Sequence, residues 1–445
     1  MLYVMNISKT DIDKLNAVVN ISIDKKDYEQ KVHTILKDYR KKANIPGFRK
    51  GHVPFGMIKK QYERAVIVDE VNKLIQENLD NYIKKEKLEL LGNPLPKEKN
   101  NSIDWNHGNM QFEFELGLAP KFEIKLDVLK KVTHYQIEPD KKMIDEQINH
   151  IQNQYGKIKA KKKIEKGFEI NAQFKNEEID LDTMANFSMK DIKSRKAIKL
   201  LNESEVGSNL NLPSKGLFID NTTAKRVLSL DDENLKKLSK LDLTLEIKEV
   251  NERIPAEINQ DLFDKLYKPG TVKSEKELKD KIKEGLQAQF KPQSNQKLMN
   301  DISETIVEKT KFKLPSDFLK KWIRSSGKEP MSEEAAIDEY NKSEKGIRYQ
   351  LIEGKIISDN NLKMTFEELK KFTETLIKKQ MGQYGQMPEK EKLDGIVSNV
   401  LSNKEETKRI SNQLMGDKML KFFIEKAPLK RKKVAFDAFI KQAYN

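Results

Sequence analysis

The segment IPGFRKGHVPFGMI, Ile45 to Ile58, joins two amphipathic stretches of the chain. Gly47 and Gly51 allow backbone conformations that other residues avoid, while a proline at each end restricts the chain. Phe48 and its two cationic neighbours, Arg49 and Lys50, lie between the glycines. A large apolar ring is not expected at the surface unless packing or a partner accounts for it. The pattern fits either a helix-to-helix turn with a core-facing Phe48 or a rigid binding loop.

The surroundings of this loop are strongly basic. Between Lys37 and Lys60 the sequence has eight Lys or Arg residues and one Asp. Such a region attracts a polyanion such as RNA, with an affinity that depends on salt.

The flanking pattern predicts strand, helix, loop, helix and strand in that order. Residues 17–23 alternate as a strand, and residues 24–44 carry apolar residues at helical spacing, with Asp24 or Asp27 as N-cap. Pro54 can open a helix, a longer helix follows at 68–88, and residues 110–118 alternate again. We therefore expect an α+β domain over residues 1–118.

The remainder divides by composition. Residues 119–154 are interpreted as a linker with extended pieces and a helix. Short strand patterns at 168–174 and 241–250 predict a small β-rich domain over 155–250, which begins with the basic run KIKAKKKIEKG. Residues 251–445 read as helical to the end, and Ser274 with Glu277 forms a capping box. The expected fold class is α+β, with several domains and an all-α C-terminal part that carries arms.

Composition excludes several classes of function. The 445 residues carry a net charge of +14 and no cysteine, so thiol catalysis and disulfides are absent. The positive charge permits nucleic-acid binding, but a lineage that favours Lys explains it equally well. A signal peptide and a membrane span are not expected, so we predict a soluble cytoplasmic protein.

No motif indicates catalysis. The five histidines are scattered and lack partners at metal-ligand spacing. They are His33, His52, His107, His134 and His150. Phosphate-binding glycine loops and nucleophile elbows are missing as well. We predict no catalytic residues, no metal and no cofactor.

Gly47-Phe48-Arg49-Lys50-Gly51-His52-Val53-Pro54 matches the G-F-R-x-G-x-x-P signature of trigger factor, the bacterial ribosome-associated chaperone. The stretches FEFELGLAPKFEI and VNERIPAEINQDLFDKL follow the same family in order, so the resemblance covers nearly the whole chain. FLKKWI, YQLIEGKI and QYGQ resemble the variant found in Bacteroidetes-type bacteria.

The resemblance implies an ATP-independent chaperone that docks at the polypeptide exit of the large ribosomal subunit and holds nascent chains. The implied ribosome-binding residues are Gly47, Phe48, Arg49, Lys50, Gly51 and Pro54, facing a ribosomal protein and nearby rRNA. It also implies a cytoplasmic, partly ribosome-associated protein without membrane contact, and a possible homodimer off the ribosome.

The middle domain departs from its relatives. Trigger factors commonly carry an FKBP-type prolyl isomerase domain with a G-D-x-V-x-(I/V)-x-F-x-G strand. In KGFEINAQFKN, Phe168 stands where Asp is expected and Asn176 lies near the expected glycine. After Tyr155 the domain has four rings and no Trp or Tyr, whereas such pockets enclose proline in an apolar cage. We predict a degenerate FKBP-like domain with weak or absent isomerase activity.

The helical half would, by resemblance, form a cradle that exposes apolar and flexible side chains to clients. The candidates are Phe318, Trp322, Ile323, Tyr349, Met381, Tyr384, Met387, Met415, Met419, Phe422 and Phe423. The alternative is that most of them belong to the helix-packing core. Two other functions remain open: an active prolyl isomerase, and a basic RNA-binding protein, although the strands lack the interleaved aromatics of RNA-reading sheets.

Overall fold

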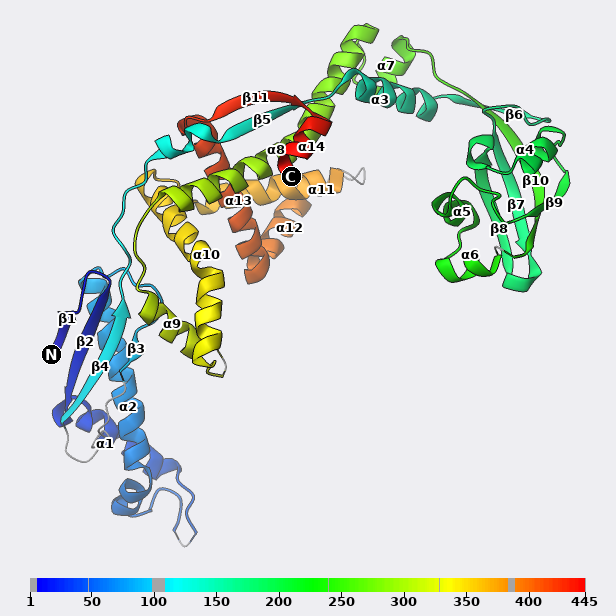
Figure 1. Cartoon of the computed structure of the whole chain (residues 1–445). Helices are drawn as coiled ribbons and strands as arrows, with labels where there is room; N and C mark the ends of the chain where they lie inside the picture. The colour runs from blue at the N-terminus through cyan, green and yellow to red at the C-terminus, as the bar shows by residue number, and fades with distance from the viewer. Residues whose placement is uncertain are drawn as a thin grey trace. The chain divides into compact units, whose positions relative to one another are not determined.

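A computed structural model describes residues 6–46, 48–97, 109–238, 240–327, 329–382 and 389–444 (Figure 1). The chain forms two compact units. One contains Met1–Thr133 and Leu298–Lys430, and the other contains His134–Lys297 and Arg431–Asn445. Both units contain helices and strands, which confirms the α+β class.

The first unit contains a four-stranded antiparallel sheet in the order β1-β2-β4-β3. Its strands are β1 Asn6–Asp11, β2 Asn16–Asp24, β3 Leu95–Pro96 and β4 Asn109–Gly117. The predicted alternation in β2 is confirmed, because Val19, Ile21 and Ile23 are completely buried. The polar strand β1 was not predicted, since its sequence NISKTD has no apolar alternation and its strand state comes from pairing with β2.

Helices α1 Lys25–Lys42 and α2 Phe55–Lys85 share a core with this sheet. Asp24 is the N-cap of α1, as expected, and its N–H donates to the Asp27 carboxylate at 2.8 Å. The α1 residues Tyr28, Val32 and Leu36 are buried at four-residue intervals. α2 is one continuous helix rather than the two that we predicted, because no glycine or proline interrupts the chain after Gly56.

The rest of the first unit is helical. It contains α9 Ser316–Ser325, α10 Glu333–Asp359, α11 Phe366–Gly382, α12 Lys390–Ser402, α13 Lys404–Lys426 and the end of α8 Glu275–Lys309. Ile302 of α8, Ile352 of α10 and Met419 of α13 are completely buried in one cluster. Leu129, from the short 3₁₀ helix η1 Leu126–Lys131, is buried in the same cluster.

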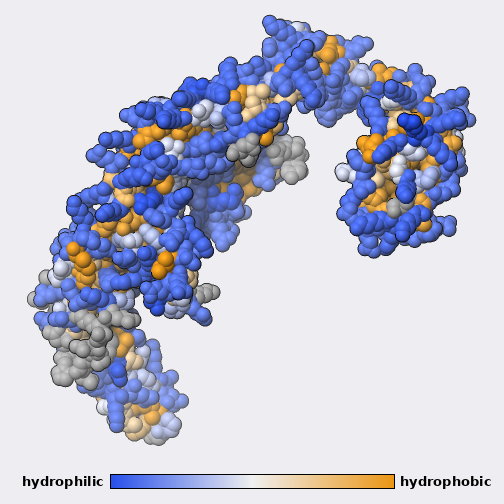
Figure 2. Space-filling view, in the orientation of Figure 1, coloured by the Kyte–Doolittle hydropathy of each residue, from blue (hydrophilic) through white to orange (hydrophobic). Residues whose placement is uncertain are grey.

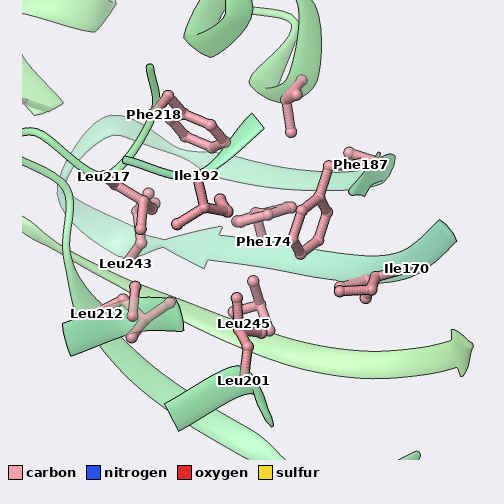
Figure 3. Packing of buried hydrophobic residues seen from close by; sticks show 14 of the residues in the cluster. Ile170, Phe174, Phe187, Ile192, Leu201, Leu212, Leu217, Phe218, Leu243 and Leu245 are labelled. Atoms are coloured by element: carbon pink, nitrogen blue, oxygen red, sulfur yellow. The ribbon is translucent and has the colours of Figure 1, made fainter. Parts of the chain in front are cut away.

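The second unit contains a five-stranded antiparallel sheet. Its order is β6-β10-β7-β8, with β9 also paired to β10. The strands are β6 Lys157–Lys161, β7 Glu169–Asn176, β8 Leu181–Ser188, β9 Asn209–Pro213 and β10 Asp242–Ile254. Helices α4 Arg195–Asn202, α5 Asn221–Leu228 and α6 Asp232–Leu238 complete this part. Their residues share one core with the sheet, in which Phe174 and Leu201 are fully buried (Figure 3).

The second unit also contains α3 Lys141–Gln154, α7 Gln260–Leu266 and the larger part of α8. Ile148 and Ile151 of α3 are buried with Leu262 of α7, so part of the predicted linker takes part in packing. The expectation that the chain is helical to its end is wrong. β11 Lys430–Ala435 pairs with β5 Thr133–Glu138 before α14 Phe436–Tyr444, because this strand and helix share a core with residues far upstream.

Candidate functional site

The loop that contains Phe48 lies between the end of α1 at Lys42 and the start of α2 at Phe55. Its backbone turns twice: the Phe48 N–H donates to the Ile45 carbonyl at 3.1 Å, and the His52 N–H donates to the Arg49 carbonyl at 2.9 Å. Gly51 has φ +85°, a left-handed conformation that glycine adopts without a steric penalty. Pro54 is the N-cap of α2 and is exposed. Gly47 lies outside the described residues.

The base of the loop is fixed to the core. Val53 and Ile58 have no exposed surface, and the Arg40 Nε–H donates to the Val53 carbonyl at 2.8 Å. The rings of His33 and Phe55 meet edge to face with centroids 5.3 Å apart. These contacts hold the two ends of the loop, so its tip is presented on a rigid base.

At the tip, Phe48 is 39% exposed, and Arg49 and Lys50 are exposed. Phe48 therefore does not face the core, so the loop is not a helix-to-helix turn with a core-facing Phe48. Met57, at 43% exposure, adds a second apolar side chain that sequence reasoning missed. Its only signal was its place in the first helical turn after Pro54. Tyr39 of α1 is also exposed, at 42%.

The cations at the tip have no acidic partner among the described residues. The single Asp of this region is taken by a neighbour: Lys41 lies 3.0 Å from Asp38, and its hydrogen bond lowers the pKa of that carboxyl group. Lys59 pairs with Glu63 at 3.4 Å. Arg49 and Lys50 thus remain available for an external carboxylate or phosphate.

The helical candidates fall into three groups. Phe318, Ile323, Met419, Phe422 and Phe423 are buried, with at most 8% exposure. Trp322, Tyr349, Met381 and Met415 are half-buried. Tyr384 and Met387 lie outside the described residues. The buried group has almost no surface to offer a client in this conformation and agrees with the alternative that these are packing residues.

Two of the helical candidates, Phe318 and Trp322, pack against Gly117 at the end of β4 and against Gly92, which precedes β3. A Cβ atom on Gly117 would lie 2.7 Å from Cε1 of Phe318, and one on Gly92 would lie 2.9 Å from Cγ of Trp322. Lys321, between them on α9, lies 2.8 Å from the Glu115 carboxylate. The two glycines are thus the contact surface for α9, which sequence reasoning missed because a lone glycine gives no sign of a distant ring.

Tyr349 of α10 has a half-buried phenol beside Glu353. Burial, with a smaller contribution from the Glu353 charge, raises the pKa of Tyr349 to about 12. Burial also raises the pKa of Glu353. Tyr349 therefore remains neutral near pH 7 and acts as a half-buried apolar surface with one hydroxyl.

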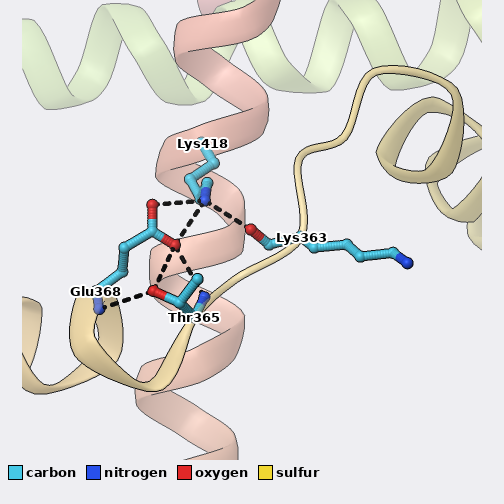
Figure 4. Close-up of polar contacts among 4 residues, drawn as sticks. All are labelled: Lys363, Thr365, Glu368 and Lys418. Atoms are coloured by element: carbon cyan, nitrogen blue, oxygen red, sulfur yellow. Dashed lines mark hydrogen bonds and ion pairs between the residues drawn. The ribbon is translucent and has the colours of Figure 1, made fainter.

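Exposed apolar side chains are scattered among hydrophilic ones on the face seen in Figure 2. Among the described residues of the helical part, the large apolar side chain with the highest exposed fraction is Phe366, 67% exposed at the first position of α11, which the sequence did not single out. Polar contacts fix this position: Lys418 Nζ donates to Glu368 at 2.9 Å and to the Lys363 carbonyl at 3.0 Å (Figure 4). The Thr365 N–H donates to Glu368 at 2.9 Å.

The rings of the middle domain are used for packing. Phe168, Phe174, Phe187 and Phe218 are each at most 7% exposed. The rings of Phe174 and Phe187 lie 5.5 Å apart. A cavity of about 320 Å³ lies beside Phe218 and is also lined by Lys193 and Ile219. Only one of the four rings therefore borders this cavity.

The described residues contain no group of three or more His, Asp or Glu side chains that could hold a metal ion. Among them, no helix is long and apolar enough to cross a membrane.

Comparison with protein families finds three models along the chain. "Bacterial trigger factor protein" matches residues 5–151, "Probable trigger factor, FKBP-like domain" matches 158–255, and "Probable trigger factor, C-terminal domain" matches 294–442. All three describe parts of the same family, and they occur in chain order.

Individual relatives agree. A trigger factor of Agrobacterium fabrum is 25% identical over 396 residues, covering 82% of this chain and 77% of its own. Trigger factors of Nitratiruptor and Chlorobaculum tepidum are 25% and 22% identical over 342 and 382 residues, covering 71% and 82% of this chain and 72% and 85% of their own. A solved structure described under "Promiscuous Substrate Recognition in Folding and Assembly Activities of the Trigger Factor Chaperone" aligns with TM-score 0.60 at 15% identity. It covers 95% of this chain and 100% of that one, which shows a shared fold.

Proposed function

Because this chain belongs to the trigger factor family, we propose that it is an ATP-independent chaperone that docks at the ribosomal polypeptide exit and holds nascent chains. The observation that carries the proposal is the loop tip. It presents an exposed Phe48 beside two cations that have no acidic partner among the described residues, on a base fixed by buried Val53. The protein then acts in the cytoplasm, partly bound to ribosomes.

The chemistry of the tip suggests the kind of partner. Phe48 fits an apolar notch on a ribosomal protein, and Arg49 can donate two parallel hydrogen bonds to one carboxylate or phosphate. Lys50 adds a point charge toward rRNA. The rigid base lowers the entropy that binding must overcome.

A photo-crosslinking experiment tests the docking site. A benzophenone amino acid replaces Phe48, and a matched variant carries it in place of Phe366, which is also exposed. Irradiated with vacant ribosomes, the first variant should crosslink to a large-subunit protein at the exit and the second should not. Equal crosslinking from both positions would show that the loop is not the docking element.

For client binding, we propose the half-buried group Trp322, Tyr349, Met381 and Met415 together with exposed Phe366. Tyr384 and Met387 remain candidates from sequence alone. The five buried residues are proposed to act in packing. In an aggregation assay with an unfolded client, Phe366→Ser should suppress aggregation less well than the wild type. Lys371→Ser, at an exposed residue of the same helix, is the control.

Prolyl isomerase activity is proposed to be weak or absent. The supporting observation is that three of the four rings lie in the core away from the cavity, which leaves Phe218 as its aromatic wall. The full chain should accelerate proline isomerisation in a short peptide little, if at all. Strong acceleration that is lost in Phe218→Ala would favour the second candidate function, an active isomerase.

Self-association off the ribosome is also proposed, on the family resemblance alone. Sedimentation velocity over a range of protein concentrations distinguishes a homodimer from a monomer.

A further inference from the structure

The basic run at the start of the FKBP-like domain has no role in the proposed docking. Residues 157–166 contain six lysines and one Glu. The first three lysines lie on β6, which pairs with β10 and ends the sheet on that side among the described residues (Figure 1). These lysines therefore occupy a free sheet edge.

The pairing of β6 with β10 shows which residues lie opposite the lysines. Lys157 and Lys159 lie opposite Ile254 and Glu252 of β10. The Glu252 carboxylate is already taken by Lys161, whose Nζ lies 2.9 Å away.

Glu169 on β7, which lies opposite Asn251 of β10, is also occupied. Arg253 donates two hydrogen bonds to it, at 2.7 and 2.9 Å. Glu252 and Glu169 are therefore paired within the sheet, whereas Glu249, next to Val250 on β10, is exposed and accepts a hydrogen bond from the Asn251 side chain at 3.3 Å.

Five lysines remain exposed without an ion pair among the described residues. They are Lys157, Lys159, Lys162, Lys163 and Lys166. Exposed acidic residues near them are Glu165, Glu205 and Glu249. The local balance thus remains strongly positive.

The backbone that carries these lysines is fixed. Ile164 and Phe168 are buried in the domain core. The Val206 N–H donates to the Lys162 carbonyl at 3.0 Å, and Lys163 forms a β-bridge with Glu205. The charges are therefore presented by an ordered strand and turn, which reduces the cost of binding.

We propose that this lysine edge binds the phosphate backbone of RNA, independently of the loop at Phe48. Lysines act as point charges for phosphates, and a row of them without arginine forks or a pocket suits a repeating polyanion better than a single carboxylate. The rings of Phe168, Phe174, Phe187 and Phe218 are buried, whereas Tyr155, two residues before Lys157, is 36% exposed and offers a ring on which any base can stack. Binding is therefore independent of base sequence.

The test uses the full chain and a labelled single-stranded oligouridylate in a fluorescence anisotropy titration. The variant replaces all five exposed lysines by Gln. A charge-matched control replaces Lys190, Lys193, Lys196, Lys199 and Lys215 of the same domain by Gln, since these are also exposed. A third variant replaces the five edge lysines by Arg.

The edge variant should bind RNA about tenfold or more weakly at low salt, and its salt slope should fall by up to roughly 3.5, about 0.7 for each lost contact. The control and Arg variants should bind as the wild type does. A Phe48, Arg49 and Lys50 triple alanine variant should also keep oligouridylate binding, whatever it does on ribosomes.

Three results would overturn the proposal. The edge and control variants could lose the same affinity, which would reduce the effect to net charge. A labelled polyglutamate of equal charge could bind more tightly than RNA, which would assign the edge to acidic proteins. The edge variant could bind RNA normally but aggregate, which would leave the lysines the role of protecting a free strand edge.

Discussion

Replacing Gly117 with alanine places a methyl group against the ring of Phe318. An ideal Cβ there would lie 2.7 Å from Cε1 and 3.0 Å from Cγ, with Cδ1 nearer still. Carbon atoms normally pack about 3.5–4.0 Å apart, so the ring must retreat by about 1 Å. Phe318 is 4% exposed and packs with Leu319, Ile323 and Tyr340, so it has little room to move. We expect a cost of about 1–3 kcal/mol in the docking of α9 on β4.

Trp322, next to this contact, reports on it. The chain has two tryptophans, so a Trp105→Phe background leaves Trp322 as the only one. In a urea titration followed by Trp322 fluorescence, the unfolding midpoint of Gly117→Ala should move to a lower urea concentration. In a Phe318→Leu background the same alanine should cost much less, because the two residues are in contact. An equal cost in both backgrounds would refute the steric argument.

Three further predictions concern separate parts of the chain. Gly51→Ala should weaken ribosome binding through a loop cost of about 1 kcal/mol, because φ is +85° and the added methyl group meets nothing within 4 Å; binding titrations of this variant and of Gly56→Ala, which also meets nothing, measure it. The pKa of Tyr349 is raised from 10.0 to about 12, so the folded state holds this proton more tightly than the unfolded state does. The free energy of unfolding should therefore fall as pH rises between these values, and it should fall less in Tyr349→Phe when unfolding is measured at several pH values. Lys418→Met should destabilise the start of α11 by about 1 kcal/mol or less, and the loss should shrink in high salt; hydrogen exchange of α11 measures it, with Lys421→Met, at a 3.9 Å pair, as the control.

Local signals made the loop and its strand-helix surroundings predictable. Val19, Ile21 and Ile23 alternate in the sequence and are buried as a strand, because the strand period is fixed by backbone geometry. Glycine and proline indicated the loop because both residues change which backbone conformations are allowed. The sequence did not predict whether Phe48 faces the core, because its exposure depends on how α1 and α2 pack together.

The helical candidates show where sequence reasoning ends. Phe318 and Met419 are residue types that suit a client-binding surface, yet both are buried. The sequence could not predict this, because apolar side chains at helical spacing occur both in packing cores and in binding surfaces. The partners of Phe318 and Trp322 are Gly117 and Gly92, about two hundred residues earlier in the chain. β11 was missed for a similar reason, because its partner β5 is even more distant in the sequence.

Cosedimentation with ribosomes measures whether the loop tip at Phe48 docks the chain. A Phe48→Ala, Arg49→Ala, Lys50→Ala variant is compared with the wild type and with a control that removes Phe366, Lys371 and Lys379, an exposed ring and two exposed lysines on α11. The wild type and the control should pellet with vacant large subunits, while the loop variant should stay in the supernatant. Cosedimentation of the loop variant at the wild-type level would contradict this prediction.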